Sequence, residues 1–391
     1  SACIAAGIKT MITSRRFVEV ARVAGIVSAL STVGIIYLED LRRRFGLADK
    51  LWLIGWALRR PRAVIRSRDP DETAVVLFTS GSEARPKGVA LSHRALLANI
   101  AQMGAVIDFG PNDKFLSSLP IYHAYALTAC TLLPLLSGTR IYLYTTPLHY
   151  HVIPELAYTR ACTYVFGTST FLAHYARQAH PYDFHSVRVV VSGAEKLNAE
   201  VASAWLHKFG LRIMEGYGAT ECAPVLSLNT PLRYRPGTVG RMLPGIEHRV
   251  IPVPGITRGG VLHVRGPNVM SGYYPSDQPA VLQPPRSEAG EGWYNTGDVV
   301  ELDDEGFVTI HGRVKRFAKI AGEMISLEVV ERIAQHASPG HQHAATLEVA
   351  SQSGESTVLF TTDPRPDRLV LVKAARLIGA QELAVARRIV K

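Results

Sequence analysis

The sequence predicts an α/β fold: a large domain with layered α/β sheets and a β-rich subdomain, followed by a small α+β carboxy-terminal domain. Three observations support this prediction. Between residues 74 and 215, short apolar runs alternate with segments of helical periodicity, which is typical of a largely parallel sheet covered by helices. From residue 237 to 310, short strand-like runs alternate with glycine-rich turns. Beyond residue 312, a basic stretch precedes one helical segment and further strand-like runs.

Individual elements follow from the same patterns. Short apolar runs bounded by polar residues or glycine predict strands at 74–78, 115–119, 140–144, 163–166, 187–192 and 212–215. Apolar residues at helical spacing predict helices at 94–107, 170–179, 199–209 and near 327–335. Ser92 supplies a hydroxyl that can cap the first of these helices. We expect the large domain to cover residues 1–311 and the small domain to cover residues 312–391.

Composition narrows the class of protein. The chain has 391 residues, of which 47% are hydrophobic and 19% charged, enough for a large core. The longest apolar stretch, 24–38, is interrupted by hydroxyl residues and is shorter than the roughly 20 residues that a membrane-spanning helix needs. The four cysteines are scattered without a CxxC pair. They are therefore predicted to be buried thiols of a cytoplasmic protein and not a disulfide framework or a zinc site.

Positive charge is concentrated near the amino terminus. The net charge is +10, and residues 1–70 contain 13 Lys and Arg against 5 Asp and Glu. The apolar stretch 51–58 carries two tryptophans and is flanked by arginines, which is typical of a segment that lies on anionic lipid. A patch for an acidic carrier protein, or a core helix with a solvated basic flank, would fit the same pattern. Nucleic acid is disfavoured as a partner because no stacking or groove-reading motif accompanies the charge.

A phosphate-binding loop is predicted directly after the strand at 74–78. Small and hydroxyl residues crowd this loop, and one lysine follows them; its candidate contacts are Thr79, Ser80, Gly81, Ser82 and Lys87. Small residues let backbone N–H groups approach an anion, while the hydroxyls and the lysine add donors and positive charge. The loop is not a Walker A motif, because glycine and not Ser or Thr follows the lysine.

Three further motifs suggest a nucleotide site. In residues 216–222, glycines on both sides of Tyr217 let the ring lie against a purine, and Glu221 offers an oxygen ligand for Mg²⁺. In residues 294–298, the carboxylate of Asp298 can accept hydrogen bonds from both ribose hydroxyls. Residues 312–323 form a cationic stretch that leads into a glycine turn at the predicted domain boundary.

In their order and spacing, these motifs resemble those of the adenylate-forming superfamily, which includes acyl-CoA synthetases, luciferases and peptide-synthetase adenylation domains. Further segments are similar to the acyl–acyl-carrier-protein synthetase part of the bifunctional 2-acylglycerophosphoethanolamine acyltransferase/acyl-ACP synthetase family. These segments are 13–15, 75–83, 147–150, 166–172, 192–197 and 315–328. The resemblance runs from about residue 8 to residue 391.

The resemblance implies a role for each matching residue. Thr79, Lys87, Glu221 and Lys315 would be catalytic, with Thr79 and Glu221 as Mg²⁺ ligands and Lys315 at the hinge of the small domain. ATP or AMP would contact Thr79, Ser80, Gly81, Ser82, Lys87, Gly193, Ala194, Glu195, Gly216, Tyr217, Gly218, Thr220, Asp298 and Arg313. The acyl pocket would include His123, Gly167 and Thr168. The thiol tunnel would be lined by Ala318, Lys319, Gly322 and Glu323.

The implied activity is that of an AMP-forming ligase. With ATP and Mg²⁺, a long-chain fatty acid would be converted to acyl-AMP and then transferred to the phosphopantetheine thiol of acyl carrier protein. The product would serve lysophospholipid reacylation at the cytoplasmic face of the inner membrane. Two alternatives stay open: a long-chain acyl-CoA synthetase, and a truncated module that binds nucleotide or lipid without turnover. A peptide-synthetase domain is disfavoured, because no acidic residue is evident for the substrate amine.

Some positions depart from the family pattern. Both ends of the chain are expected to be truncated, since the family has more of its large domain before the residue matching Ser1. After Lys391, the family has a glycine-rich segment whose lysine contacts the substrate carboxylate, so we expect this fragment to bind ATP and to adenylate poorly. Ala84 stands where glycine is usual in the phosphate loop, and Ala126 replaces a glycine beside the acyl pocket.

Overall fold

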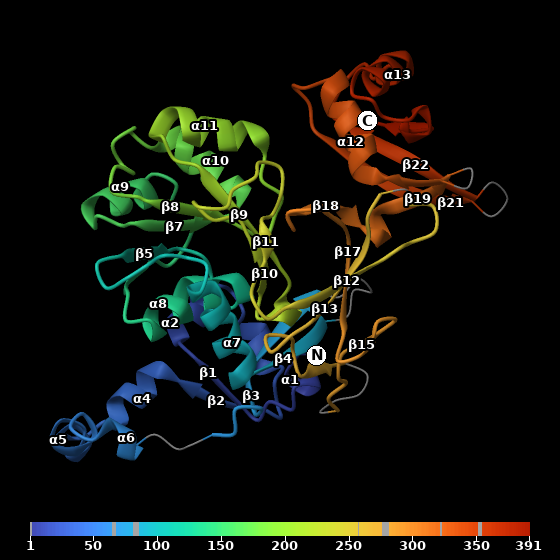
Figure 1. Cartoon of the computed structure of the whole chain (residues 1–391). Helices are drawn as coiled ribbons and strands as arrows, with labels where there is room; N and C mark the ends of the chain where they lie inside the picture. The colour runs from blue at the N-terminus through green and yellow to red at the C-terminus, as the bar shows by residue number, and fades with distance from the viewer. Residues whose placement is uncertain are drawn as a thin grey trace.

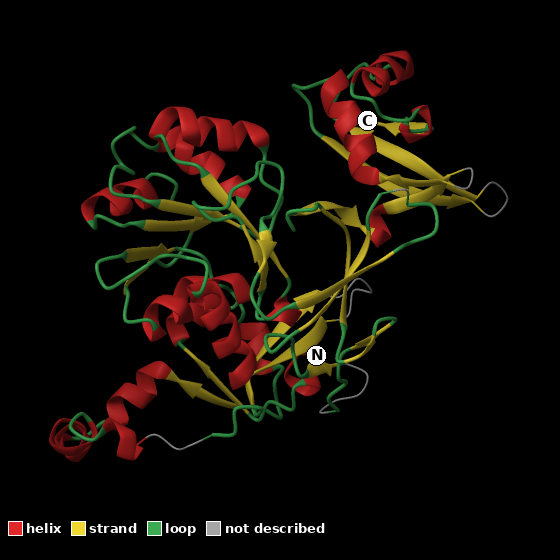
Figure 2. Ribbon diagram, viewed as in Figure 1, coloured by secondary structure: helices red, strands yellow, loops and turns green. Residues whose placement is uncertain are grey.

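The computed structural model describes residues 2–64, 68–80, 86–256, 258–275, 281–320, 323–350 and 354–391. Figure 1 shows a sheet covered by helices, a second β-rich region beside it, and a carboxy-terminal part set apart at the end of the chain. Figure 2 shows that strands dominate the region between them. This is the mixed α/β fold that the sequence predicts.

The largest sheet has seven strands in the order β11-β10-β9-β8-β7-β5-β6. Their bounds are β5 Lys114–Ser117, β6 Arg140–Leu143, β7 Tyr164–Gly167, β8 Val189–Ser192, β9 Ile213–Gly218, β10 Val225–Leu228 and β11 Arg241–Met242. From β6 to β9 the strands are parallel, and β10 and β11 join antiparallel. Five of the six predicted strands lie in this sheet.

The sixth predicted strand lies elsewhere. β3 (Thr73–Ser80) pairs antiparallel with β4 (Pro86–Ser92), and β14 (Gly272–Tyr274) joins β4 from the other side. The expectation that residues 74–78 belong to the parallel sheet was therefore wrong. A short apolar run predicts a strand but not the strand with which it pairs. β4 begins with Pro-Lys-Gly, residues that do not indicate a strand, so the sequence does not predict the second strand of this hairpin.

Helices cover both faces of the large sheet. Alternate strand residues point to opposite faces: Val165 and Val190 pack with α10 (Ser169–Gln178), while Phe166 and Val191 lie in the cluster that includes α7 (His93–Gly104). The other covering elements are α8 (Leu133–Leu136), α9 (Val152–Thr159), α11 (Ala199–Phe209) and the π-helical segment η2 (Ala126–Leu132).

The helices begin where the sequence offers caps. The hydroxyl of Ser92 accepts a hydrogen bond from the Ala95 amide at 3.1 Å, as predicted, and the side chain of Asn198 caps α11. Gly210 ends α11 with φ +69°, a left-handed conformation that favours glycine.

A four-stranded antiparallel sheet follows, in agreement with the predicted β-rich region. Its order is β12-β13-β17-β18. Its strands are β12 Glu247–Ile251, β13 Gly260–Arg265, β17 Tyr294–Leu302 and β18 Val308–Arg313, with a small hairpin of β15 Arg286–Ser287 and β16 Gly290–Glu291 beside them. The pairing of β17 with β18 places Asp298 opposite Arg313.

The carboxy-terminal region has an apolar cluster of its own. Ile320, Val330 and Leu359 are among its buried members. The elements are the turn η4 Val314–Arg316, β19 Phe317–Ile320, β20 Glu323–Ser326, α12 Leu327–Ala337, β21 His343–Ala350, β22 Gly354–Thr361, α13 Arg368–Leu377, η5 Glu382–Ala384 and β23 Arg388–Val390. That residues 312–391 move as a separate domain stays a prediction.

The amino-terminal region combines a small parallel sheet with short helices. Strands β1 (Thr10–Thr13) and β2 (Gly34–Tyr37) pair with each other. The helices are α1 Ala2–Ala5, α2 Arg15–Val20, α3 Ala24–Ser28, α4 Leu38–Arg44, α5 Leu47–Trp52, the π-helical turn η1 Leu53–Ala57 and α6 Pro61–Val64. Within the described ranges, every helix is too short or too polar to cross a bilayer.

Candidate active site

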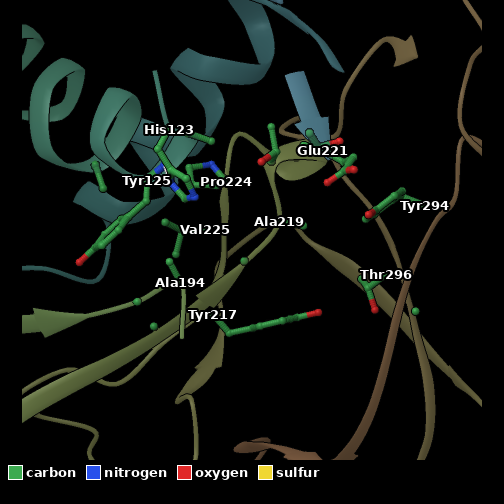
Figure 3. Close-up of a pocket in the computed structure, with 18 of the residues that line it drawn as sticks. His123, Tyr125, Ala194, Tyr217, Ala219, Glu221, Pro224, Val225, Tyr294 and Thr296 are labelled. Atoms are coloured by element: carbon green, nitrogen blue, oxygen red, sulfur yellow. Dashed lines mark hydrogen bonds between the residues drawn. The ribbon is translucent and has the colours of Figure 1, made fainter. Parts of the chain in front are cut away.

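A cavity of about 820 Å³ opens beside the carboxyl ends of β8 and β9. Segments far apart in the sequence line it: β3 and β4, the turn after β8, the end of β9 with the following turn η3 (Thr220–Cys222), the start of β17, and η4. In Figure 3, His123 and Tyr125 lie on one side of the cavity and Glu221 and Tyr294 on the other, with Tyr217 below them. The carboxyl edge of a parallel sheet is where α/β enzymes commonly bind ligands.

Close backbone packing fixes the segment that follows β9. A side chain on Gly218 would place its Cβ 2.0 Å from the carbonyl oxygen of Pro224, so only glycine fits there. This contact folds the chain back at η3, which brings Thr220 and Glu221 to the cavity. The side chain of Tyr217, one residue earlier, lines the same cavity.

Glu221 is buried and held by a tyrosine. The hydroxyl of Tyr273 donates a hydrogen bond of 2.6 Å to Oε1 of Glu221. Burial, then the charge of Glu221, raises the pKa of Tyr273, so this hydroxyl stays protonated and remains a donor. A carboxylate has about four lone-pair sites, so Glu221 retains capacity for a cation.

A positive charge lies over the same tyrosine. Lys87 Nζ is 5.6 Å from the centre of the Tyr273 ring, a cation–π distance, and the pairing of β4 with β14 brings these strands together. Thr79 stands opposite Lys87 in the β3–β4 pair. Hydroxyl, ammonium and carboxylate groups therefore meet at one end of the cavity.

Magnesium suits this donor set. Mg²⁺ is usually bound by one or two carboxylates together with substrate phosphates and water, and Glu221 and Thr79 offer one carboxylate and one hydroxyl. The described residues contain no group of three or more His, Cys, Asp or Glu that could hold a metal by protein ligands alone. Phosphate oxygens would have to complete the coordination.

Asp298 lies behind the cavity wall with two partners. Tyr217 donates a hydrogen bond of 2.6 Å to one carboxylate oxygen of Asp298, and Nε of Arg313 donates one of 3.1 Å to the other. Burial raises the pKa of Asp298, although the bond from Tyr217 and the Arg313 charge oppose the shift. These two bonds hold the ring of Tyr217 and the guanidinium group of Arg313 at the cavity.

The opposite end of the cavity is apolar. Its lining there is Met103, Ile107, Ala129, Leu133, Phe166, Val191, Val225 and Leu228. His123 borders this end as an exposed residue, and partial desolvation by the surrounding chain lowers its pKa, which favours the neutral imidazole. Tyr125 donates a hydrogen bond of 3.1 Å to the Val191 carbonyl, so its ring presents an apolar surface. The cavity can therefore hold a ligand that is anionic at one end and aliphatic at the other.

Most of the residues singled out from the sequence meet at this cavity. Those that line it are Thr79, Lys87, His123, Gly193, Ala194, Gly216, Tyr217, Gly218, Thr220, Glu221, Arg313 and Lys315.

Other expected residues lie outside the cavity lining. Thr168 caps α10, and a Cβ on Gly167 would approach Leu172 to 2.9 Å, so both shape the end of β7. Glu195 accepts hydrogen bonds from the amide and hydroxyl of Thr170. Ala318 is fully buried in the carboxy-terminal cluster.

The remaining expected residues are described only in part. Ser80 lies in β3, Lys319 in β19 and Glu323 in β20, and the structure describes the backbone of all three but not their side chains. Gly81, Ser82 and Gly322 lie outside the described residues.

Sequence reasoning missed several lining residues. Tyr273 and Tyr294 flank Glu221, and Tyr125 and Ser192 border the turn after β8. Tyr294 belongs to the same motif as Asp298, so the sequence could have predicted that it lies at the site. No sequence motif marks Tyr273, because its position at the site depends on the pairing of β14 with β4, a strand about 180 residues earlier in the chain.

The chain matches a known family over most of its length. The model of the AMP-binding enzyme family matches residues 2–274. A long-chain-fatty-acid–CoA ligase of Escherichia coli O157:H7 is 31% identical over 316 residues, 76% of this chain and 54% of the relative. A p-hydroxybenzoic acid–AMP ligase of Mycobacterium tuberculosis is 30% identical over 337 residues, 83% of this chain and 46% of the relative. The chain thus spans about half the length of the curated relatives it matches.

Solved structures share the fold. ATP-bound MatB from Rhodopseudomonas palustris superposes with a TM-score of 0.77 at 23% identity, covering 98% of this chain and 75% of that one. The O-succinylbenzoate coenzyme A synthetase MenE from Bacillus subtilis, in complex with ATP and magnesium ion, gives 0.77 at 20% identity, covering 97% and 75%. Enzymes of the AMP-binding family use ATP with Mg²⁺, the pair expected from the sequence. The chain belongs to the AMP-binding enzyme family, the adenylate-forming superfamily.

Proposed function

We propose that this chain activates a long-chain fatty acid with ATP and transfers the acyl group to the phosphopantetheine thiol of acyl carrier protein. The observation that carries the proposal is the single cavity in which Lys87, Thr220 and Glu221 lie at one end and an aliphatic lining at the other. A fatty acid and a nucleotide together have this distribution of charge. The fatty-acid CoA ligases among the relatives support the substrate class.

The first half-reaction joins the carboxylate to AMP. A carboxylate is a weak electrophile with a poor leaving group, so attack of its oxygen on the α-phosphorus of ATP, with loss of pyrophosphate, creates a reactive mixed anhydride. In the proposed arrangement, Lys87 and Thr220 bind phosphate oxygens, and Glu221 and Thr79 would hold Mg²⁺, which would supply positive charge to the phosphates. Tyr217 and Gly193-Ala194 flank the adenine, and Arg313 binds near the ribose. The apolar end orients the chain so that its carboxylate meets the phosphate.

The second half-reaction breaks the mixed anhydride. The thiol sulfur attacks the acyl carbon, a thioester forms, and AMP leaves with the bonding electrons. We propose that Lys315 acts as the hinge about which residues 312–391 rotate between the two steps, bringing Ala318 to Glu323 to the thiol. The resulting acylated carrier protein would donate its acyl group for lysophospholipid reacylation at the cytoplasmic face of the membrane.

Coenzyme A is the second candidate acceptor. The observation in its favour is that the fatty-acid relatives at about 30% identity are CoA ligases. Incubation with radiolabelled fatty acid, ATP and Mg²⁺, followed by equal concentrations of holo-acyl carrier protein or coenzyme A, separates the two. Label on the carrier protein supports the proposal, and label on coenzyme A alone identifies an acyl-CoA synthetase. If ATP binds and neither acceptor is labelled, the chain is a binding module.

A further inference from the structure

The segment 47–64, here called the arm, exposes apolar side chains in an unusual number. It consists of α5, η1 and α6, and Figure 1 shows α5 and α6 at one end of the molecule, away from the large sheet. Leu51 is 63% exposed, Ile54 62% and Leu58 66%. Both tryptophans of the arm are exposed as well, Trp52 to 51% and Trp56 to 39%.

The apolar surface of the arm is not a single stripe. A helix that packs on a protein core is apolar on one face and polar on the other, yet every residue of 51–58 except Ala57 is exposed. The centres of the Trp52 and Trp56 rings lie 5.6 Å apart, so the two side chains contact each other. A contiguous exposed apolar patch of this kind marks an interaction surface.

Cationic side chains frame this surface. Lys50 lies on its amino-terminal side and Arg59, Arg60 and Arg62 on its carboxy-terminal side, all exposed. The single acidic residue in the arm, Asp49, accepts a hydrogen bond of 2.8 Å from the Gly46 amide and so serves as a cap. The arm therefore offers a net positive charge beside tryptophan and aliphatic groups.

An anionic bilayer matches both properties at once. Lys and Arg gain from the negative surface potential, indole rings prefer the headgroup level, and aliphatic side chains enter the acyl boundary. An acidic carrier protein would satisfy the arginines but would leave this much aliphatic surface in water. We propose that the arm docks on the surface of an anionic lipid bilayer, with Trp52 and Trp56 at the headgroup level and the arginines on lipid phosphates.

Tryptophan fluorescence gives a direct measurement. The chain has four tryptophans, and the two outside the arm, Trp205 and Trp293, are buried. A blue shift on addition of vesicles therefore reports Trp52 and Trp56. We expect a shift and co-sedimentation with vesicles of phosphatidylcholine and phosphatidylglycerol in equal parts, and much less with phosphatidylcholine alone.

Matched variants test charge and apolar contact separately. The triple change Arg59→Gln, Arg60→Gln and Arg62→Gln is expected to weaken binding on the order of 100-fold. A control triple with the same loss of charge at exposed arginines elsewhere, Arg140→Gln, Arg177→Gln and Arg387→Gln, should bind as the parent does. The double change Ile54→Ser and Leu58→Ser should also weaken binding on the order of 100-fold.

The outcomes decide between partners. Absence of vesicle binding, or equal loss in the control triple, would overturn the proposal. Binding to acyl carrier protein that is lost in the arm arginine triple but kept in the control triple, without vesicle binding, would overturn the proposal and assign the arm to the carrier. Because the assay contains no ATP and no fatty acid, its result is independent of the ligase proposal.

Discussion

At the scale of single residues, one hydrogen bond fixes the carboxylate at the phosphate end of the cavity. The Tyr273 hydroxyl donates to Glu221, and Lys87 lies over the ring of the same tyrosine. Tyr273 thus contacts both charged groups that we assign to the phosphates and the metal. It is a positioning residue, because it acts on the ligand through these two side chains.

Removing this hydroxyl tests the assignment. Tyr273→Phe keeps the ring and deletes the hydrogen bond to a charged group, which is worth about 1.5–3 kcal/mol. We expect the Mg²⁺ concentration for half-maximal adenylation to rise roughly tenfold or more, with the KM for fatty acid unchanged. Tyr274→Phe, the next residue of β14, is the control. A purely structural role would lower the melting temperature and leave the Mg²⁺ dependence as it was.

His123 is exposed at the cavity mouth but partly desolvated by the surrounding chain, which predicts a small pH dependence of stability. Its pKa is lowered from 6.5 in the folded chain, so the unfolded chain binds more protons as the pH falls. The stability from the neutral imidazole is fully present above the unfolded pKa and is lost as pH drops below it. We expect the unfolding free energy to fall only slightly from about pH 7 to about pH 5, because solvent screens an exposed ring, and to fall less steeply in His123→Gln. Equal slopes in urea titrations of the two proteins would contradict this.

At the scale of elements, the turn from β9 into η3 places Tyr217, Thr220 and Glu221 at the cavity. The sequence Gly216-Tyr217-Gly218 ends β9, and the carbonyl of Pro224 leaves no room for a side chain on Gly218. Glycine at this point is needed for packing, and the position of Glu221 follows from it.

Two glycines in this strand make a matched pair. Gly218→Ala forces the backbone of Pro224 to move, and we expect a loss of about 1–3 kcal/mol in unfolding free energy together with weakened ATP binding. In Gly216→Ala the nearest atom belongs to the flexible Leu228 side chain, at 3.1 Å, and the backbone oxygens lie at ordinary contact distance, so its effect should be smaller on both measurements. Calorimetry of ATP binding and thermal unfolding of both variants provide the comparison. A larger effect at Gly216 would contradict the packing argument.

The sequence predicted the elements of the large sheet better than their partners. Periodicity identified five of its strands, and the predicted cap at Ser92 is a local feature that a sequence shows directly. It misplaced the strand at β3, since antiparallel pairing with β4 depends on a hairpin whose second arm begins with proline and lysine. For the same reason Tyr273 was missed, whereas Glu221 and Arg313 were found from motifs that are local in sequence.

At the scale of the whole molecule, one exposed ion pair links the large sheet region to the carboxy-terminal region. Lys196 Nζ lies 3.4 Å from Oε2 of Glu328 in α12. If residues 312–391 rotate between the half-reactions, this contact must break each time. A surface pair of this kind contributes about 0–1 kcal/mol.

Lys196→Ala is therefore expected to change the rate of thioester formation while leaving the unfolding free energy almost unchanged. The unfolding free energy should change by less than about 1 kcal/mol, while thioester formation accelerates up to about fivefold relative to acyl-AMP formation. Single-turnover measurements of each half-reaction report this ratio, and Lys208→Ala, a lysine on α11 that bonds within the large region, is the control. Equal acceleration of both steps would contradict rotation about this contact.

The central claim is that the cavity couples a fatty acid to a nucleotide through Glu221 and the phosphate residues. ATP–pyrophosphate exchange tests it most directly, because exchange requires reversible acyl-AMP formation and no thiol acceptor. We predict slow exchange, in keeping with the poor adenylation expected from the sequence, that depends on Mg²⁺ and on a long-chain fatty acid and that falls at least about 100-fold in Glu221→Gln. ATP binding without exchange at any fatty acid chain length, or exchange that is unaffected by Glu221→Gln, would contradict the account.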